Sequence, residues 1–128
     1  MATKTGEVLA ALLSQLLAQS SEIEGAAVIG VDGLVYSANM PYRDMDEDLT
    51  GAVAAAIFAL GVRSVSQLKR GQLLRVLVQG DDGNIIVTVI NKQTVFVALT
   101  PKDINLGMAF AEAKSISVKL AEALGSLV

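Results

Sequence analysis

The segment from Leu49 to Leu68 constrains the fold most, because it is a helical pattern with almost no polar side. Two apolar stripes and a third, small-residue side run along it. The first stripe is Leu49, Val53, Ile57, Leu60 and Leu68; the second is Ala54, Phe58, Gly61 and Val65; the small side is Ala52, Ala55, Ala59 and Val62. A surface helix normally has one apolar stripe and one charged face. Because no charge lies between Asp48 and Arg63, this helix must bury more than one face. The sequence therefore predicts an oligomer or a docking surface.

A helix and a hairpin are predicted before this segment. Apolar residues recur at three- and four-residue spacing over residues 5–20, which predicts an amphipathic helix with Thr5 as its N-cap. Two β-rich runs, 26–31 and 34–38, flank Asp32-Gly33. That dipeptide predicts a hairpin whose two central residues both have positive φ. Asp46 or Asp48 is expected to cap the long helix.

Three strands and a last helix are predicted after it. The runs 72–79, 84–90 and 94–100 are separated by short polar turns, which favours an antiparallel meander. Pro101, with Thr100 and Asp103 as a loose capping box, is expected to open the last helix. The exposed side of that helix is expected to carry Glu112, Lys114, Lys119 and Glu122.

The predicted order of elements is therefore α-β-β-α-β-β-β-α. Both faces of the meander strands are apolar, so helices should cover both sides of the sheet. We expect an α/β (α+β) fold with a five-stranded antiparallel sheet and helices on both faces. Residues 1–128 are expected to form a single domain, since this length suits one hydrophobic core.

The composition disfavours an enzyme. The sequence has no His and no Cys, which removes the commonest general base, zinc ligand and thiol nucleophile. Acidic residues cluster before the long helix, and Asp81-Asp82 lie in a turn. In such places we expect solvated residues that favour helix starts and turns, not catalytic acids or a calcium loop. No catalytic residue, cofactor or metal is expected.

Other partner classes are also disfavoured. The net charge is −3, Trp is absent and the basic residues are spread along the chain, which is unlike a nucleic-acid-binding protein. No phosphate-binding glycine loop is present. The longest apolar run, Ala52–Val62, is shorter than the roughly 18–20 residues of a membrane span. The segment Met1–Glu7 is unlike a signal peptide. We expect no membrane span and a cytoplasmic location.

The only concentrated basic group is Arg63, Lys69, Arg70 and Arg75. The first three are expected at the end of the long helix, where positive charge is favourable. Arg75 alternates with Leu73 and Leu77 along the predicted strand. If that strand lies at an edge of the sheet, Arg75 guards it against open-ended pairing or takes part in a specific interface.

Several segments in this order resemble the Roadblock/dynein light chain domain family, which has a longin- and profilin-like fold. They are the hairpin segment 26–37, the Ala-rich helix up to Leu60-Gly61, the run 73–80 and the closing Asn105-Leu106-Gly107-Met108. The resemblance covers roughly Val8 to Leu124. It implies a sheet with one helix on one side and two on the other.

The resemblance also implies a homodimer formed through the middle helix and the third strand. The implied interface residues are Val53, Ala56, Ile57, Leu60, Gly61, Ser64, Leu73, Arg75 and Leu77. Family members scaffold or regulate small Ras-like GTPases or attach cargo to dynein, and no universal catalytic residue is carried over. We therefore expect a non-enzymatic homodimer that binds, scaffolds or regulates such a GTPase. Which stripe of the long helix faces the partner stays open.

Two alternatives remain open. One is a small-ligand sensor module of the profilin, longin or PAS-like kind, which would need a cavity with convergent polar groups. The other is an adaptor associated with dynein or another motor. Direct catalysis by Asp or Glu is the least supported function.

Overall fold

The computed structural model describes residues 4–125, so the ends of the predicted domain, 1–3 and 126–128, lie outside the described residues. The predicted order of elements is confirmed. It is α1 (Lys4–Gln19), β1 (Gly25–Gly30), β2 (Val35–Asn39), α2 (Glu47–Gln67), β3 (Arg75–Gly80), β4 (Gly83–Val89), β5 (Thr94–Thr100) and α3 (Leu106–Gly125).

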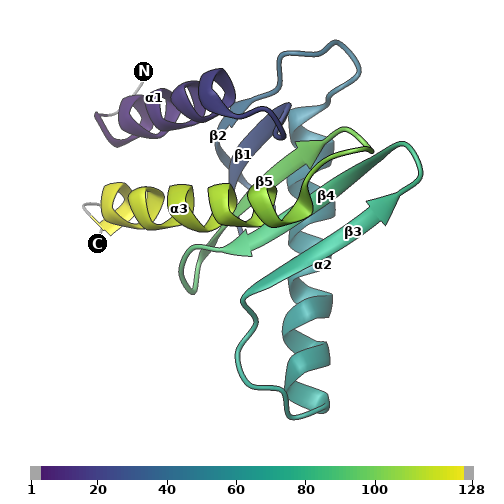
Figure 1. The fold of residues 1–128 in the computed structure, drawn as a ribbon. Helices are drawn as coiled ribbons and strands as arrows, with labels where there is room; N and C mark the ends of the chain where they lie inside the picture. The colour runs from purple at the N-terminus through teal and green to yellow at the C-terminus, as the bar shows by residue number, and fades with distance from the viewer. Residues whose placement is uncertain (1–3, 126–128) are drawn as a thin grey trace.

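The strands form one five-stranded sheet in the order β2-β1-β5-β4-β3. All four neighbouring pairs are antiparallel, so the predicted hairpin and meander are confirmed. β5 lies at the centre and pairs with both β1 and β4, while β2 and β3 form the two edges (Figure 1). The last strand of the meander thus joins it to the hairpin.

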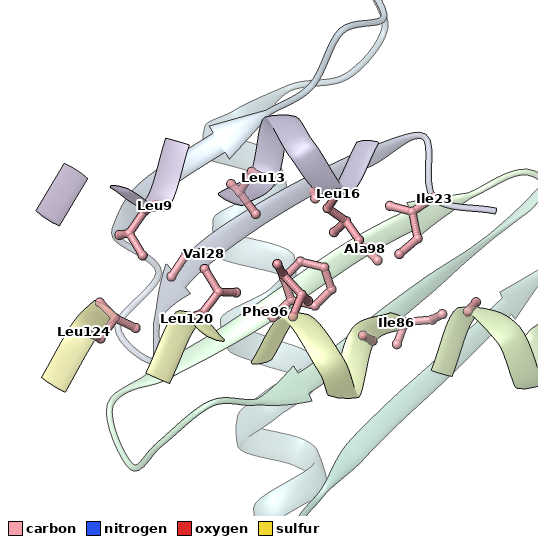
Figure 2. Packing of buried hydrophobic residues seen from close by; sticks show 14 residues of the cluster. Leu9, Leu13, Leu16, Ile23, Val28, Ile86, Phe96, Ala98, Leu120 and Leu124 are labelled. Atoms are coloured by element: carbon pink, nitrogen blue, oxygen red, sulfur yellow. The ribbon is translucent and has the colours of Figure 1, made fainter. Parts of the chain in front are cut away.

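Helices cover both faces of the sheet, as predicted. Figure 1 shows α1 and α3 in front of the sheet and α2 behind it. On the α1/α3 face, leucines of both helices meet over Val28, Ile86 and Phe96 of the sheet (Figure 2). On the α2 face, Ala54 packs with a separate buried group of strand residues: Ala27, Ile29, Val87, Val95 and Val97. The sheet therefore separates two cores.

The helix caps differ in part from the expectation. Asp46 caps α2, because its carboxylate accepts a hydrogen bond of 3.0 Å from the backbone N–H of Leu49. Thr5 lies inside α1, so the prediction that it caps the helix was wrong. The predicted capping box of Thr100 and Asp103 was also wrong. Asn105 takes that role in α3, since its Oδ1 accepts from the N–H of Met108 at 3.0 Å.

The hairpin turn and one strand boundary also differ. β1 ends at Gly30 and β2 begins at Val35, and in this loop only Gly33 has a positive φ, of 93°. Asp32 instead accepts a hydrogen bond from the N–H of Leu34 through its side chain, which closes the turn by another route. The predicted two-residue turn was therefore wrong. β3 begins only at Arg75, so Leu73 belongs to the connection from α2.

Candidate interaction surface

The second apolar stripe of α2 faces the chain's own sheet. Ala54 is buried, and Phe58, Gly61 and Val65 are partly buried. Gly51, one turn before Ala54, is buried on the same side. The structure thus identifies which stripe of α2 packs against the chain's own sheet, a question that the sequence left open.

Glycines let α2 approach its own sheet closely. A Cβ atom placed on Gly61 would lie 2.9 Å from Cδ2 of Leu73 and 3.0 Å from Cγ2 of Val76. The lack of a side chain at Gly61 therefore serves a contact within the chain. Leu73 is the partner in that contact, so these two predicted interface residues lie against each other.

The first stripe, which we call the outer stripe (Leu49, Val53, Ile57, Leu60 and Leu68), runs along α2 to its C-cap Leu68, and all of it except Ile57 is exposed. Leu49, Leu60 and Leu68 are 62%, 64% and 70% exposed. Val53 is also exposed, and Ile57 is partly buried because it contributes to the core under α2. Figure 1 shows that the C-terminal part of α2 runs beyond the sheet. Contiguous exposed apolar side chains of this size mark an interaction surface.

β3 offers a free backbone edge beside α2. Among residues 4–125, β3 pairs only with β4 and forms an outer edge of the sheet. This is the arrangement that the interpretation of Arg75 required. The guanidinium of Arg75 lies 5.5 Å from the centre of the Phe110 ring on α3. Leu77 packs against the α1/α3 core, whereas Val76 packs against the α2 core.

The structure therefore divides the predicted interface residues into three groups. Val53, Ala56 and Leu60 are exposed on α2, with Ile57 and Ser64 partly buried. Gly61 and Leu73 face each other, and Arg75 and Leu77 lie on the opposite face of the sheet from α2. An edge strand pairs through its backbone, so side chains from both faces can border one interface.

The two ends of α2 carry opposite charge. Asp44, Asp46, Glu47 and Asp48 surround its N-terminus and are exposed. Arg63, Lys69 and Arg70 are exposed around its C-terminus. Within residues 4–125, no three carboxylates or other ligand side chains are grouped so that they could hold a metal ion.

Surface grooves adjoin both ends of α2. One of about 530 Å³ lies between the C-terminal half of α2 and the β3–β4 region, and Phe58, Val62 and Leu74 line its apolar part. Another of about 460 Å³ lies at the N-terminal end of α2 and includes Glu24, Asp44 and Asp82. Both grooves are open at the surface, and the first lies between α2 and the sheet, which is where a ligand sensor would hold its ligand.

By length and composition alone, α2 could also cross a membrane. An 18-residue window of α2 has a mean hydropathy of 1.6, and 17% of that window is buried. The expectation of no membrane span considered only the shorter apolar run Ala52–Val62. A helix packed within a domain passes the same test, and Ala54, Ile57 and Phe58 do pack with the sheet.

One polar residue was placed wrongly from the sequence. Glu112 was expected on the exposed side of α3, but it is partly buried and its Oε1 is fully buried without a hydrogen-bond partner. The sequence did contain a sign of this burial. Glu112 is three residues after Ala109 and four before Ile116, so it lies next to these two buried residues on the helix surface. The polarity of Glu112 masked its position at the border of the apolar stripe.

Comparisons with known proteins agree with this geometry. The family model described as Roadblock/LC7 domain matches residues 4–100. A protein of Methanocaldococcus jannaschii without an assigned function is 30% identical over 104 residues, covering 81% of this chain and 90% of that protein.

Solved structures show the same fold. Myxococcus xanthus MglB superimposes with a TM-score of 0.89 at 16% identity, covering 100% of this chain and 96% of that chain. A structure described as MglB with tetrameric arrangement gives a TM-score of 0.90 at 15% identity, with the same coverage of 100% and 96%.

Proposed function

The chain belongs to the Roadblock/LC7 domain family, and from this membership we propose that it is a homodimeric interaction module that binds and regulates a small Ras-like GTPase. The observation that carries the proposal is the exposed outer stripe of α2, next to the free edge of β3. One surface thus offers both apolar side chains and unpaired backbone groups.

Self-association follows from the spacing of the exposed side chains. Leu49, Val53, Ala56, Leu60 and Arg63 alternate at intervals of four and three residues. This is the spacing of a seam between two paired helices. Ala56 at its centre is small, which allows the backbones of two copies to approach closely. The MglB structure with tetrameric arrangement supports self-association of this fold in another protein.

The charges at the ends of α2 favour an antiparallel pair. Leu49 and Arg63 both lie seven residues from Ala56, on either side of it. An antiparallel pair centred on Ala56 would place Arg63 of one copy beside Leu49 of the other, next to Asp48. A parallel pair would instead bring like charges together at both ends, which is unfavourable.

Regulation of a GTPase is the part of the proposal that rests on the family. Members scaffold or regulate small Ras-like GTPases, and a paired α2 surface would give such a partner a composite apolar platform. The sequence has no His and no Cys, so we propose that the module acts by shape and apolar complementarity, without chemistry of its own. We further propose a cytoplasmic location.

Two measurements test the proposal. Size-exclusion chromatography with light scattering at micromolar concentration should give twice the mass of 13.3 kDa. An affinity-tagged copy should then co-purify a GTPase from its host, and GTP turnover by that GTPase should change when the protein is added. A strict monomer would contradict the first part, and unchanged turnover by a bound GTPase would contradict regulation.

A further inference from the structure

The groove of about 460 Å³ at the N-terminal end of α2 adjoins both parts of the proposed interface. Leu49 of the outer stripe lines it on one side, and Asp82 of the turn between β3 and β4 lines it on the other. β3 is the edge strand that leads into this turn. A second copy that pairs through α2 and β3 therefore borders the groove.

This groove, which we call the acidic groove, is lined by negative charge alone. Its lining has four carboxylates and no Lys or Arg; the carboxylates are those of Glu24, Asp44, Asp46 and Asp82. Glu24 is partly buried and the other three are exposed, so a cation from outside can reach them. Within residues 4–125 no ion pair joins any of the four to a cation. Uncompensated acids gathered in one groove favour a cationic occupant.

Asn84 adds to the negative potential of the acidic groove. It lines the groove and is 3% exposed. Its Nδ2 donates to Oγ1 of Thr100 and to the carbonyl oxygen of Pro101, both at 3.1 Å. Its Oδ1 has no hydrogen-bond partner, so the negative end of this amide dipole is not compensated. The amide thus offers the carboxylates no donor, and the compensating charge has to come from outside.

Cations that match the acidic groove lie just beyond the other end of α2. Lys69 and Arg70 follow its C-cap and are exposed. Asp44 and Leu68 each lie twelve residues from Ala56, on either side of it. An antiparallel pair centred on Ala56 therefore brings the end of α2 from one copy beside the residues that precede α2 in the other. The C-terminal part of α2 runs beyond its own sheet (Figure 1), which leaves this end free to reach a second molecule.

We propose that the acidic groove receives Lys69 and Arg70 of a second copy of the chain, so that each copy fills the groove of the other. The inference rests on the antiparallel dimer proposed above and adds a contact outside α2, at the β3–β4 turn. A twofold pair repeats every contact, so two filled grooves stabilise each dimer. A related chain that lacks either the acids or the basic pair loses this contact, and the groove therefore selects which copies associate.

Exchanging the charges tests this contact. Asp44→Lys with Asp82→Lys (the groove variant) and Lys69→Glu with Arg70→Glu (the helix-end variant) should each weaken the homodimer by about tenfold or more, because like charges then meet. All four residues are exposed, so circular dichroism should show an unchanged fold. An equimolar mixture should form a heterodimer more tightly than either variant forms a homodimer. Analytical ultracentrifugation measures the three dissociation constants.

The matched control is Asp103→Lys with Glu122→Lys. It makes the same change in net charge at two exposed acids that do not line the acidic groove. The dissociation constant of its homodimer should equal that of the unmodified chain.

Cross-linking tests the contact without changing any charge. The sequence has no Cys, so each introduced thiol is unique. A mixture of Tyr42→Cys, in the groove lining, and Leu68→Cys should give a covalent dimer with a short bis-maleimide. Neither variant alone should do so, because identical positions lie at opposite ends of an antiparallel pair. Met108→Cys on α3 is the control partner for Leu68→Cys and should not link, although Met108 is 51% exposed and Tyr42 is 54% exposed.

The outcomes separate this contact from the dimer itself. A strictly monomeric unmodified chain would overturn both. A dimer in which the groove variant associates as tightly as the control, the mixture shows no preference for the heterodimer, or the Tyr42–Leu68 link is absent would overturn the groove contact alone. Saturable binding of tetralysine to the unmodified dimer, lost in the groove variant, would overturn a second copy as the occupant in favour of another basic chain.

Discussion

A Cβ atom placed on Gly51 would lie 2.6 Å from the carbonyl oxygen of Gly33. The N-terminal half of α2 therefore rests directly on the backbone of the β1–β2 loop. Cγ2 of Val35 lies 3.1 Å from the same position, so a side chain at Gly51 would meet two neighbours at once. This contact positions α2, and with it the outer stripe.

Gly51→Ala should lower the free energy of unfolding by about 1–3 kcal/mol, because backbone atoms cannot give way as flexible side chains do. That loss exceeds the gain of about 1 kcal/mol that Ala brings to a helix interior. Gly107→Ala in α3 is the matched control, since its nearest neighbour would be an ordinary 3.4 Å away. Urea unfolding of both variants measures the difference. An equal change in the free energy of unfolding in Gly51→Ala and Gly107→Ala would contradict the close contact at Gly51.

Leu60→Glu should convert the proposed dimer to a monomer without unfolding it. Leu60 is exposed in the single chain, so the new charge costs the monomer little, whereas burying it unpaired in an interface is strongly unfavourable. Ile57→Glu should also split the dimer but should destabilise the fold as well, because Ile57 contributes to the core under α2. Light scattering and circular dichroism separate the two effects.

Val118→Glu is the control for Leu60→Glu, since Val118 is similarly exposed but lies on α3. It should leave the mass of the assembly unchanged. If Leu60→Glu remained a dimer, the outer stripe would not be the interface.

Arg63→Glu and Asp48→Arg should each weaken self-association, because each places like charges together in an antiparallel pair. A mixture of the two variants should form a heterodimer more readily than either variant forms a homodimer, since reversed charges then face each other. Native mass spectrometry of the mixture measures this. A mixture with no preference for the heterodimer would contradict the antiparallel arrangement while leaving dimer formation itself untouched.

Arg75→Ala should lower the free energy of unfolding by about 0.5–1 kcal/mol, the usual range for an exposed cation–π contact. Arg75→Lys should retain part of the stabilisation from this contact, because Lys keeps the positive charge. A double-mutant cycle with Phe110→Leu isolates the contact, because the coupling vanishes if Arg75 does not lie over the ring. Arg43→Ala, a change of another exposed arginine, is the control.

Asp46→Ala should cost about 1 kcal/mol of stability, since it removes the acceptor for the N–H of Leu49. Asp46→Asn should retain most of the stability that the cap contributes, because its amide oxygen can accept the same hydrogen bond. Asp44→Ala removes a nearby exposed acid that has no capping role and should change stability by less. Thermal unfolding at one ionic strength compares the three variants.

The fold could be predicted because its main patterns are local. The alternation of β-rich runs, the position of short turns and the helical spacing of apolar residues gave every element in the right order. The errors lie at a turn and at a helix start, where a single side chain determines which backbone hydrogen bonds form. Asp32 closes its turn through its own carboxylate, and Asn105 caps α3 in place of an earlier pair.

The interaction surface could be predicted only in part. That α2 needs a partner followed from its lack of charge, but the assignment of its stripes depended on Gly51 and Gly61, whose neighbours come from distant parts of the chain. Glu112 was missed because polarity usually predicts exposure, while its burial depends on how α1 packs beside α3.

The sheet keeps the core under α2 apart from the core under α1 and α3. Substitutions that reshape the outer side of α2 therefore leave the packing of the other layer intact. During evolution, a lineage that duplicated such a gene could alter which copies associate through α2 while inheriting an unchanged scaffold. The three related proteins found in the single archaeon Methanocaldococcus jannaschii are a natural collection in which to look for that divergence.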